Sequence, residues 1–215
     1  MPGFYYCSWD NHNRFGSITP SFARWSSAST TQEYREFQMK QIEELLTQYG
    51  KIGEVWIDIP GLLGHDGRRK QYEQIAGLQP DTVIMMNAGF THGEKLDIDY
   101  AWPTDILAIE RGLPCAPTKK YGYSPWFRIG DGGADEKDYY IAGEVCDTIG
   151  WSWFYAEGDQ PRSEQDLLGM YLVTISRGAN FLLDVPPDKH GQIQPMYVEA
   201  LMRLRKNLEK LGLIL

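Results

Sequence analysis

The sequence predicts an α/β fold, a TIM-barrel-like (β/α)8 domain that is incomplete, with about five βα units. Strand-like and helix-like segments alternate about five times along the 215 residues, and such alternation requires a parallel sheet with right-handed crossovers. Polar and acidic residues recur at the ends of the strand-like segments, as on the ligand-binding face of a β/α barrel. Because about eight strands close such a barrel, the chain is expected to hold only part of one.

The composition is that of one globular domain. Of the residues, 42% are hydrophobic and 13% aromatic, which is enough to bury a sizeable core. The formal net charge of −8 argues against nucleic acid or an anionic membrane as partner, because a phosphate-binding face needs an excess of Lys and Arg. No apolar run reaches the roughly 18 residues that span a bilayer. A neutral or cationic ligand fits this composition better.

The elements of the first half follow from hydrophobic periodicity and from turn residues. The expected order is a strand at 4–8, a helix with a Thr30 and Glu33 capping box that ends at Gly50, a strand at 54–58, a helix from about 68 to 78, and a strand at 82–87. Pro60-Gly61 and Pro80 mark the ends of two of these elements.

After Asn87 the pattern loosens into a Pro-rich and Gly-rich segment with one apolar patch, Asp105–Ile109, which runs into Glu110. A long irregular segment inside a compact domain is usually a functional loop rather than a linker. Order resumes near 144–149, and then come a helix that begins at Ser163, a strand at 180–185 and a closing helix at 196–211.

The polar residues expected at the carboxyl ends of strands are Asp10, Asp58, Asn87, Glu110, Glu144 and Asp184. Asp58 draws attention because Trp56 lies two residues earlier and therefore on the same face of the strand. A carboxylate beside an indole wall is typical of a sugar site. The alternative is that Asp58 only caps the next loop through local hydrogen bonds.

Neither the cysteines nor the N-terminus indicates a secreted, disulfide-bonded protein. Cys7, Cys115 and Cys146 are odd in number and lack metal-ligand spacing, so they are expected to be buried thiols. The first residues lack the charged and apolar regions of a signal peptide.

Four segments resemble, in order, blocks of the retaining α-L-fucosidases of glycoside hydrolase family 29. Residues 4–12 are similar to its G-x-Y-x-S-x-W-D segment, in the form found in the subfamily that prefers branched α-1,3/4 fucosides. Residues 54–58 are similar to the E-x-W-F-D nucleophile strand, 144–153 to the W-E-x-C block, and 176–188 to the S-x-G-G-N-x-L-L-N ending. Together they cover nearly the whole chain.

The resemblance implies that residues 1–215 are the C-terminal portion of a glycosidase catalytic barrel. It implies hydrolysis of terminal α-L-fucosyl residues from glycans by a retaining double displacement, without a cofactor or metal. Family members carry further strands upstream with a paired-histidine fucose site, so an upstream segment or a homo-oligomer would complete the barrel. Many members are secreted, periplasmic or lysosomal. A non-catalytic remnant or a carbohydrate-binding fragment is the alternative.

The resemblance also implies roles for three carboxylates. Asp58 takes the nucleophile position. Glu110 is favoured over Glu144 as acid/base, and burial or the charge of Asp58 should raise the pKa of whichever residue is the acid. The alternatives are that Glu110 pairs with Arg111, and that Glu144 is a buried carboxylate that holds the barrel together.

Aromatic and polar side chains supply the expected sugar contacts. Trp56, Trp151 and Trp153 are candidates for stacking on fucose, although at least one should belong to the core. Trp9, Asp10 and His12, at the end of the first strand, complete the expected substrate-binding residues. Asn87-Ala88-Gly89 stands where many members have Asn-Asp-Arg.

Overall fold

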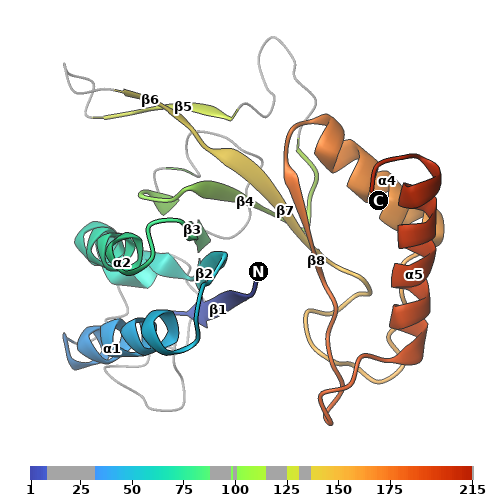
Figure 1. Ribbon diagram of the computed structural model, residues 1–215, viewed down its shortest axis with the longest axis horizontal. Coiled ribbons are helices and arrows are strands. Elements are labelled where there is room, and N and C mark those ends of the chain that lie inside the picture. The colour runs from blue at the N-terminus through green and yellow to red at the C-terminus, as the bar shows by residue number, and fades with distance from the viewer. Residues whose placement is uncertain (9–31, 88–97, 99–100, 115–124, 131–136, 215) are drawn as a thin grey trace.

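A computed structural model describes residues 1–8, 32–87, 98, 101–114, 125–130 and 137–214. Within these ranges the chain forms a curled sheet of six parallel strands with helices on its outer side (Figure 1). The strands, in their order across the sheet, are β1 (Gly3–Cys7), β2 (Glu54–Asp58), β3 (Val83–Asn87), β4 (Ile106–Glu110), β7 (Ala142–Thr148) and β8 (Asn180–Asp184). This arrangement is half of a β/α barrel, as the sequence predicted.

Alternation along each strand separates an outer face from an inner one. In β2, Val55 and Ile57 point outward and Trp56 points inward. The inner cluster combines Trp56 with Met85, Ala108 and Cys146, one residue from each of β2, β3, β4 and β7. The outer face under the helices and the middle of the inner face are therefore apolar.

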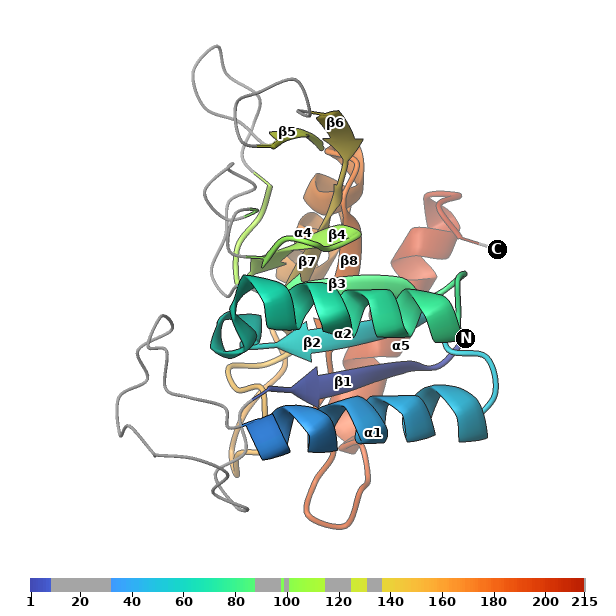
Figure 2. The ribbon, with the colours of Figure 1, turned by 90° about the vertical axis from the view of Figure 1, so that its left-hand side faces the viewer.

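Two pairs of helices cover the outer face (Figures 1 and 2). Helices α1 (Gln32–Gln48) and α2 (Gly64–Leu78) pack on β1 to β3 through Ile42, Leu46 and Ile75. Helices α4 (Glu164–Ser176) and α5 (Pro195–Lys210) pack together beside β8 through Leu167 and Tyr197. The Ser163 side chain accepts a hydrogen bond from the Asp166 backbone at 3.0 Å, so the predicted start of α4 is confirmed.

A hairpin lies in the segment that the sequence led us to expect as irregular. Strands β5 (Trp126–Ile129) and β6 (Lys137–Tyr140) pair antiparallel, and Phe127 packs with Leu107 on the outer face of β4. The hairpin thus helps to cover the outer face of β4. Its strands are only four residues long, which is too short for a clear alternation in sequence.

Two predicted boundaries differ from the structure. Helix α2 begins at Gly64 rather than near Arg68 and follows the short 3-10 helix η1 (Pro60–Leu63). Strand β7 begins at Ala142 and runs to Thr148, so Glu144 lies in its interior and the prediction of a strand-end position for Glu144 was wrong. Within the described ranges no helix combines the length and apolarity needed to cross a membrane.

Candidate active site

Asp58 ends strand β2 and lies among three hydrogen-bond donors. Its Oδ2 accepts from the Tyr5 hydroxyl at 2.5 Å. Its Oδ1 accepts from Asn87 Nδ2 at 2.8 Å and from the Ile59 backbone at 3.0 Å. The Ile59 contact is the local capping bond that was the alternative reading of Asp58, but the other two donors come from neighbouring strands. Both carboxylate oxygens are therefore held in fixed positions by the sheet.

Glu110 ends strand β4 and meets Asp58 across β3. The same Asn87 nitrogen that contacts Asp58 also donates to Glu110 Oε2 at 3.3 Å. Two oxygens that share one donor nitrogen cannot be further apart than the sum of their distances to that nitrogen. Here this sum is below roughly 6.5 Å, the smallest separation of the two carboxyl groups in inverting glycosidases. The bound excludes the wide separation of an inverting pair and is compatible with the roughly 5 to 5.5 Å of a pair that carries out a double displacement.

The residue after each of these carboxylates has a left-handed backbone conformation. Ile59 and Arg111 both have φ of 52°, and they are the non-glycine residues with positive φ in the described part of the chain. This conformation is uncommon for ordinary residues and is a genuine outlier for β-branched Ile. It turns the chain sharply at the end of β2 and of β4, which leaves Asp58 and Glu110 at the strand tips.

Tyr5 and Trp56 form an aromatic wall beside Asp58. Their rings stack with centroids 6.0 Å apart and planes 23° from parallel. Partial burial of the hydroxyl end of the side chain and its hydrogen bond to the Asp58 carboxylate raise the pKa of Tyr5 well above its ordinary value, so the hydroxyl remains a donor. Trp56 is only 8% exposed and belongs to the inner core cluster, as expected for at least one of the candidate tryptophans.

Glu144 lies deeper in the barrel than Asp58 and Glu110. Its side chain accepts from the Trp56 indole at 2.9 Å and from Asn180 at 2.7 Å, and the residue is 1% exposed. The carboxyl of Glu54, at the start of β2, hydrogen-bonds to it. Burial, together with the charge and hydrogen bond of Glu144, raises the pKa of Glu54 to about 7. The raised pKa makes Glu54 a carboxyl that binds a proton up to near neutral pH.

Further carboxylates surround Cys146, which is buried as expected. Burial and the nearby charges of Glu110, Glu144, Asp184 and Asp147 raise the pKa of its thiol. Asp184 ends β8, and burial raises its pKa as well. Cys7 is half-buried rather than buried, and neither Cys7 nor Cys146 forms a disulfide with another described residue, while Cys115 lies outside the described residues.

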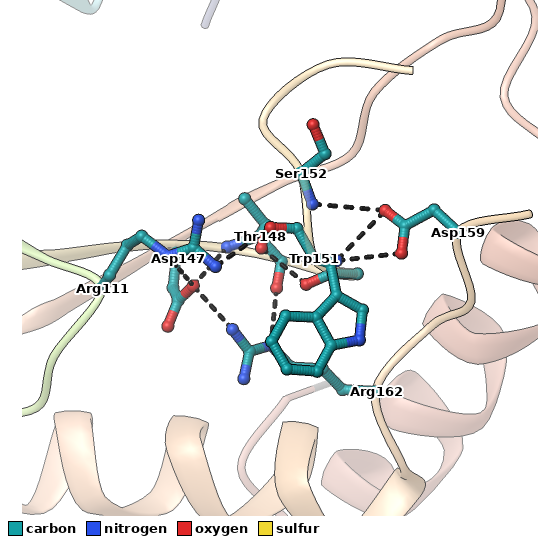
Figure 3. Close-up of polar contacts among 8 residues, drawn as sticks. Arg111, Asp147, Thr148, Trp151, Ser152, Asp159 and Arg162 are labelled. Atoms are coloured by element: carbon teal, nitrogen blue, oxygen red, sulfur yellow. Dashed lines mark hydrogen bonds and ion pairs between the residues drawn. The ribbon is translucent and has the colours of Figure 1, made fainter. Parts of the chain in front are cut away.

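The loop after β7 brings Trp151 and Trp153 to the same end of the sheet. Trp153 packs against the inner core cluster, and the Arg111 guanidinium lies 5.6 Å from its ring centroid. Trp151 is 80% exposed, and its backbone carbonyl accepts from Arg111 at 3.0 Å (Figure 3). Arg111 also approaches Asp147 at 4.0 Å, so the contacts of this guanidinium are to Asp147 and the loop after β7, not to Glu110 as one alternative held.

The predicted residues are thus brought together in part. Asp58, Glu110 and Trp56 meet at one end of the sheet, whereas Trp9, Asp10 and His12 lie outside the described residues. Tyr5 was missed as a site residue. Its nearness to Asp58 follows from the register in which β1 pairs with β2, where Cys7 lies opposite Asp58, and the sequence alone carries no signal of that register.

The arrangement suits displacement at an acetal carbon. A carboxylate held by fixed donors can attack, and a second carboxyl group close to it can protonate the leaving oxygen and later activate water. The aromatic wall can contact the apolar face of a ring-shaped substrate.

Comparison with known proteins gives a consistent result. The family profile described as Alpha-L-fucosidase matches residues 3–212. Alpha-L-fucosidase 1 of Arabidopsis thaliana is 30% identical over 213 residues, which covers 93% of this chain and 37% of that protein. The alpha-L-fucosidase of Dictyostelium discoideum is 28% identical over 204 residues, or 90% of this chain and 38% of that one. The chain therefore spans well under half the length of these relatives.

Solved structures share the fold. Alpha-L-fucosidase isoenzyme 1 from Paenibacillus thiaminolyticus superposes with a TM-score of 0.68 at 23% identity, over 96% of this chain and 48% of that one. The alpha-L-fucosidase AlfC from Lactobacillus casei, in complex with its alpha-L-fucose product, gives a TM-score of 0.67 at 20% identity, over 99% of this chain and 61% of that one. The half-barrel thus corresponds to part of a larger known domain.

Proposed function

This chain belongs to the alpha-L-fucosidase family, and on that premise we propose that it hydrolyses terminal α-L-fucosyl residues of oligosaccharides or glycoconjugates with retention of configuration. The observation that carries the proposal is the Asn87 side chain, which contacts Asp58 and Glu110 at once. In a retaining glycosidase these are the two groups that must lie close together.

Asp58 is the nucleophile in this proposal. It attacks the anomeric carbon of fucose as the bond to the leaving oxygen breaks, and a covalent glycosyl-enzyme forms. The hydroxyl of Tyr5 and the amide of Asn87 hold the attacking carboxylate in line during both steps.

Glu110 is the acid/base. As an acid it gives its proton to the leaving oxygen, and as a base it then takes a proton from the water that releases fucose. Glu144 is the less suitable group because its two oxygens are occupied by Trp56 and Asn180 in the closed interior of the sheet.

The finer parts of the proposal concern substrate and assembly. The sequence of residues 4–12 is similar to that of the α-1,3/4-preferring subfamily, so branched α-1,3/4 fucosides are the proposed substrates. The described sheet has open edges at β1 and β8, and Tyr5 on its inner face is 63% exposed. We propose that residues 1–215 are one domain, the C-terminal portion of the catalytic barrel, completed by an upstream segment or a second copy.

The experiment is release of fucose from a Lewis-type oligosaccharide, followed by exchange of the carboxylates. In the full protein, Asp58→Asn should remove hydrolysis while the fold is retained. Azide should restore activity to Glu110→Ala, because a small anion can attack the glycosyl-enzyme without base assistance.

Two outcomes would overturn these assignments. Azide rescue of Glu144→Ala, with no rescue of Glu110→Ala, would transfer the acid/base role to Glu144. Binding of the oligosaccharide without any release of fucose would favour the second candidate, a non-catalytic carbohydrate-binding protein.

A further inference from the structure

The loop between β7 and α4, residues 149–162, exposes three aromatic rings. Trp151 and Phe154 are each 80% exposed, the most exposed aromatic side chains in the described residues, and Tyr155 is 42% exposed. Single exposed apolar residues are ordinary, but several large rings on one short segment are typical of a binding surface. The function proposed above uses none of these three rings.

The loop is tied down at its centre by Asp159. Its carboxylate accepts the Trp151 backbone N–H at 3.0 Å and the Ser152 backbone N–H at 3.3 Å (Figure 3). Burial alone would raise the pKa of Asp159, but these hydrogen bonds and one from Tyr197 bring it below its ordinary value. A Cβ on Gly150 would come within 2.6 Å of the same carboxylate, so only glycine fits beside it.

The loop is also closed at its ends. Arg162 donates through Nε to the Thr148 carbonyl at 2.9 Å and through Nη2 to Asp147 at 2.9 Å. The Thr148 hydroxyl donates to the Gly150 carbonyl at 2.7 Å. Because the loop backbone is held at these points, a ligand that binds to its rings loses less affinity to ordering the segment.

The loop is joined to the end of β4 through Arg111, the residue after Glu110. The guanidinium donates to the Trp151 carbonyl at 3.0 Å and lies over the ring of Trp153. Trp153 in turn packs against the inner core cluster, which contains Trp56, two residues before Asp58. The N-terminal part of the loop, which carries the exposed rings, is therefore joined to the end of β4 that carries Glu110.

The position of the loop beside the end of β4 indicates which part of a substrate it would contact. The acid of a glycosidase protonates the oxygen of the leaving group, so the leaving sugar must lie on the acid's side of the broken bond. Resting on the proposed function, we propose that Trp151, Phe154 and Tyr155 form a platform that binds the sugar to which fucose is attached. Aromatic faces suit the C–H faces of a neutral hexopyranose, and the acidic chain disfavours an anionic ligand.

The test compares two substrates of the full protein. Fucosylated lactose carries the leaving sugars, whereas α-L-fucosyl fluoride has none. Trp151→Ala combined with Phe154→Ala should lower kcat/KM for fucosylated lactose roughly 10- to 100-fold, mainly through KM, and change kcat/KM for the fluoride by less than about twofold. Trp151→Phe should restore most of the loss because it restores a ring.

The matched control is Trp126→Ala, which removes another exposed indole, 62% exposed, from the β5–β6 hairpin. This variant should have the wild-type kcat/KM for both substrates. If the double variant lost kcat/KM equally for both substrates, the proposal would be overturned and the rings would be assigned to the fucose site. Unchanged hydrolysis of fucosylated lactose would overturn it as well.

A binding measurement separates this proposal from the proposed function. If the wild-type protein releases no fucose from either substrate, the proposed function has failed, and the platform is tested by saturation-transfer NMR with lactose alone. Lactose signals that are present with the wild type and lost in the double variant support the platform. Signals that are absent with the wild type, or that persist in the double variant because lactose binds elsewhere, overturn it.

Discussion

The hydroxyl of Tyr5 makes the shortest contact to the proposed nucleophile, at 2.5 Å from Asp58 Oδ2. Hydrogen bonds to a charged group are worth about 1.5 to 3 kcal/mol, so we expect Tyr5→Phe to lower kcat roughly 10- to 100-fold. Tyr6→Phe is the matched control because it removes a hydroxyl from the same strand, one that donates to Gln41 at 2.7 Å near α1. Steady-state kinetics on fucosylated lactose and circular dichroism check both variants. Equal losses would show that Tyr5 only supports the strand.

The second prediction at the residue scale concerns Glu54. Its pKa of about 7 in the folded protein is above its ordinary value of 4.5, so the folded state binds more protons in this range. The free energy of unfolding should therefore contain a term that is present below about pH 4.5 and is lost as the pH rises through about 7. Glu54→Gln should flatten the decrease of Tm between about pH 5 and pH 8, measured by thermal melts.

The control for this prediction is Glu43→Gln on the exposed side of α1, which should leave the slope of Tm against pH unchanged. If Glu54→Gln also leaves the slope unchanged, Glu54 does not bind a proton up to near neutral pH.

Single residues were predictable from the sequence where the strand pattern was regular. Asp58 follows an alternation of β-branched and aromatic residues, and its place at the tip of β2 is confirmed. The role of Tyr5 could not be predicted, because it depends on the register between β1 and β2, which are far apart in sequence. Glu144 was predicted at a strand end but lies in the interior of β7, because Ala142 and Gly143, where β7 begins, give no strand signal.

At the scale of elements, two glycines give opposite predictions. Gly169 lies inside α4, and a Cβ there would meet nothing within 4 Å. We expect Gly169→Ala to raise the free energy of unfolding by about 0.5 to 1 kcal/mol. Gly150→Ala should lower it by about 1 to 3 kcal/mol because the new methyl displaces the Asp159 carboxylate from two backbone donors. Denaturant unfolding measures both changes in the free energy of unfolding. If Gly150→Ala changed it by the same amount as Gly169→Ala, Asp159 would not hold the loop in place.

Among the elements, those with a long periodic pattern were the predictable ones. Helices α1 and α5 follow apolar stripes, and Ser163 marks the start of α4. The turns after Asp58 and Glu110 could not be predicted, since Ile59 and Arg111 are poor residues for a left-handed conformation. Only the surrounding packing imposes that conformation, and packing is not visible in a single sequence.

At the scale of the whole molecule, the open edges of the sheet lead to a prediction. In the described residues β1 and β8 each pair on one side only, and unpaired strand edges bind other strands. Residues 1–215 expressed alone should therefore self-associate in a concentration-dependent way and release fucose at least roughly 100-fold more slowly than the protein with its barrel completed. Analytical ultracentrifugation and a fucose assay check this. A monomer at all concentrations with full activity would contradict the partial barrel.

The order of strands in the sheet has a consequence for how the chain folds during synthesis. In the six-stranded sheet the strands lie side by side in the same order as in the sequence, from β1 to β8. A ribosome releases strands in that same order, so each new strand can add to the growing edge of a sheet that is already formed. Every pairing waits only for the next crossover to emerge, and no early strand must stay unpaired until the last one has been translated.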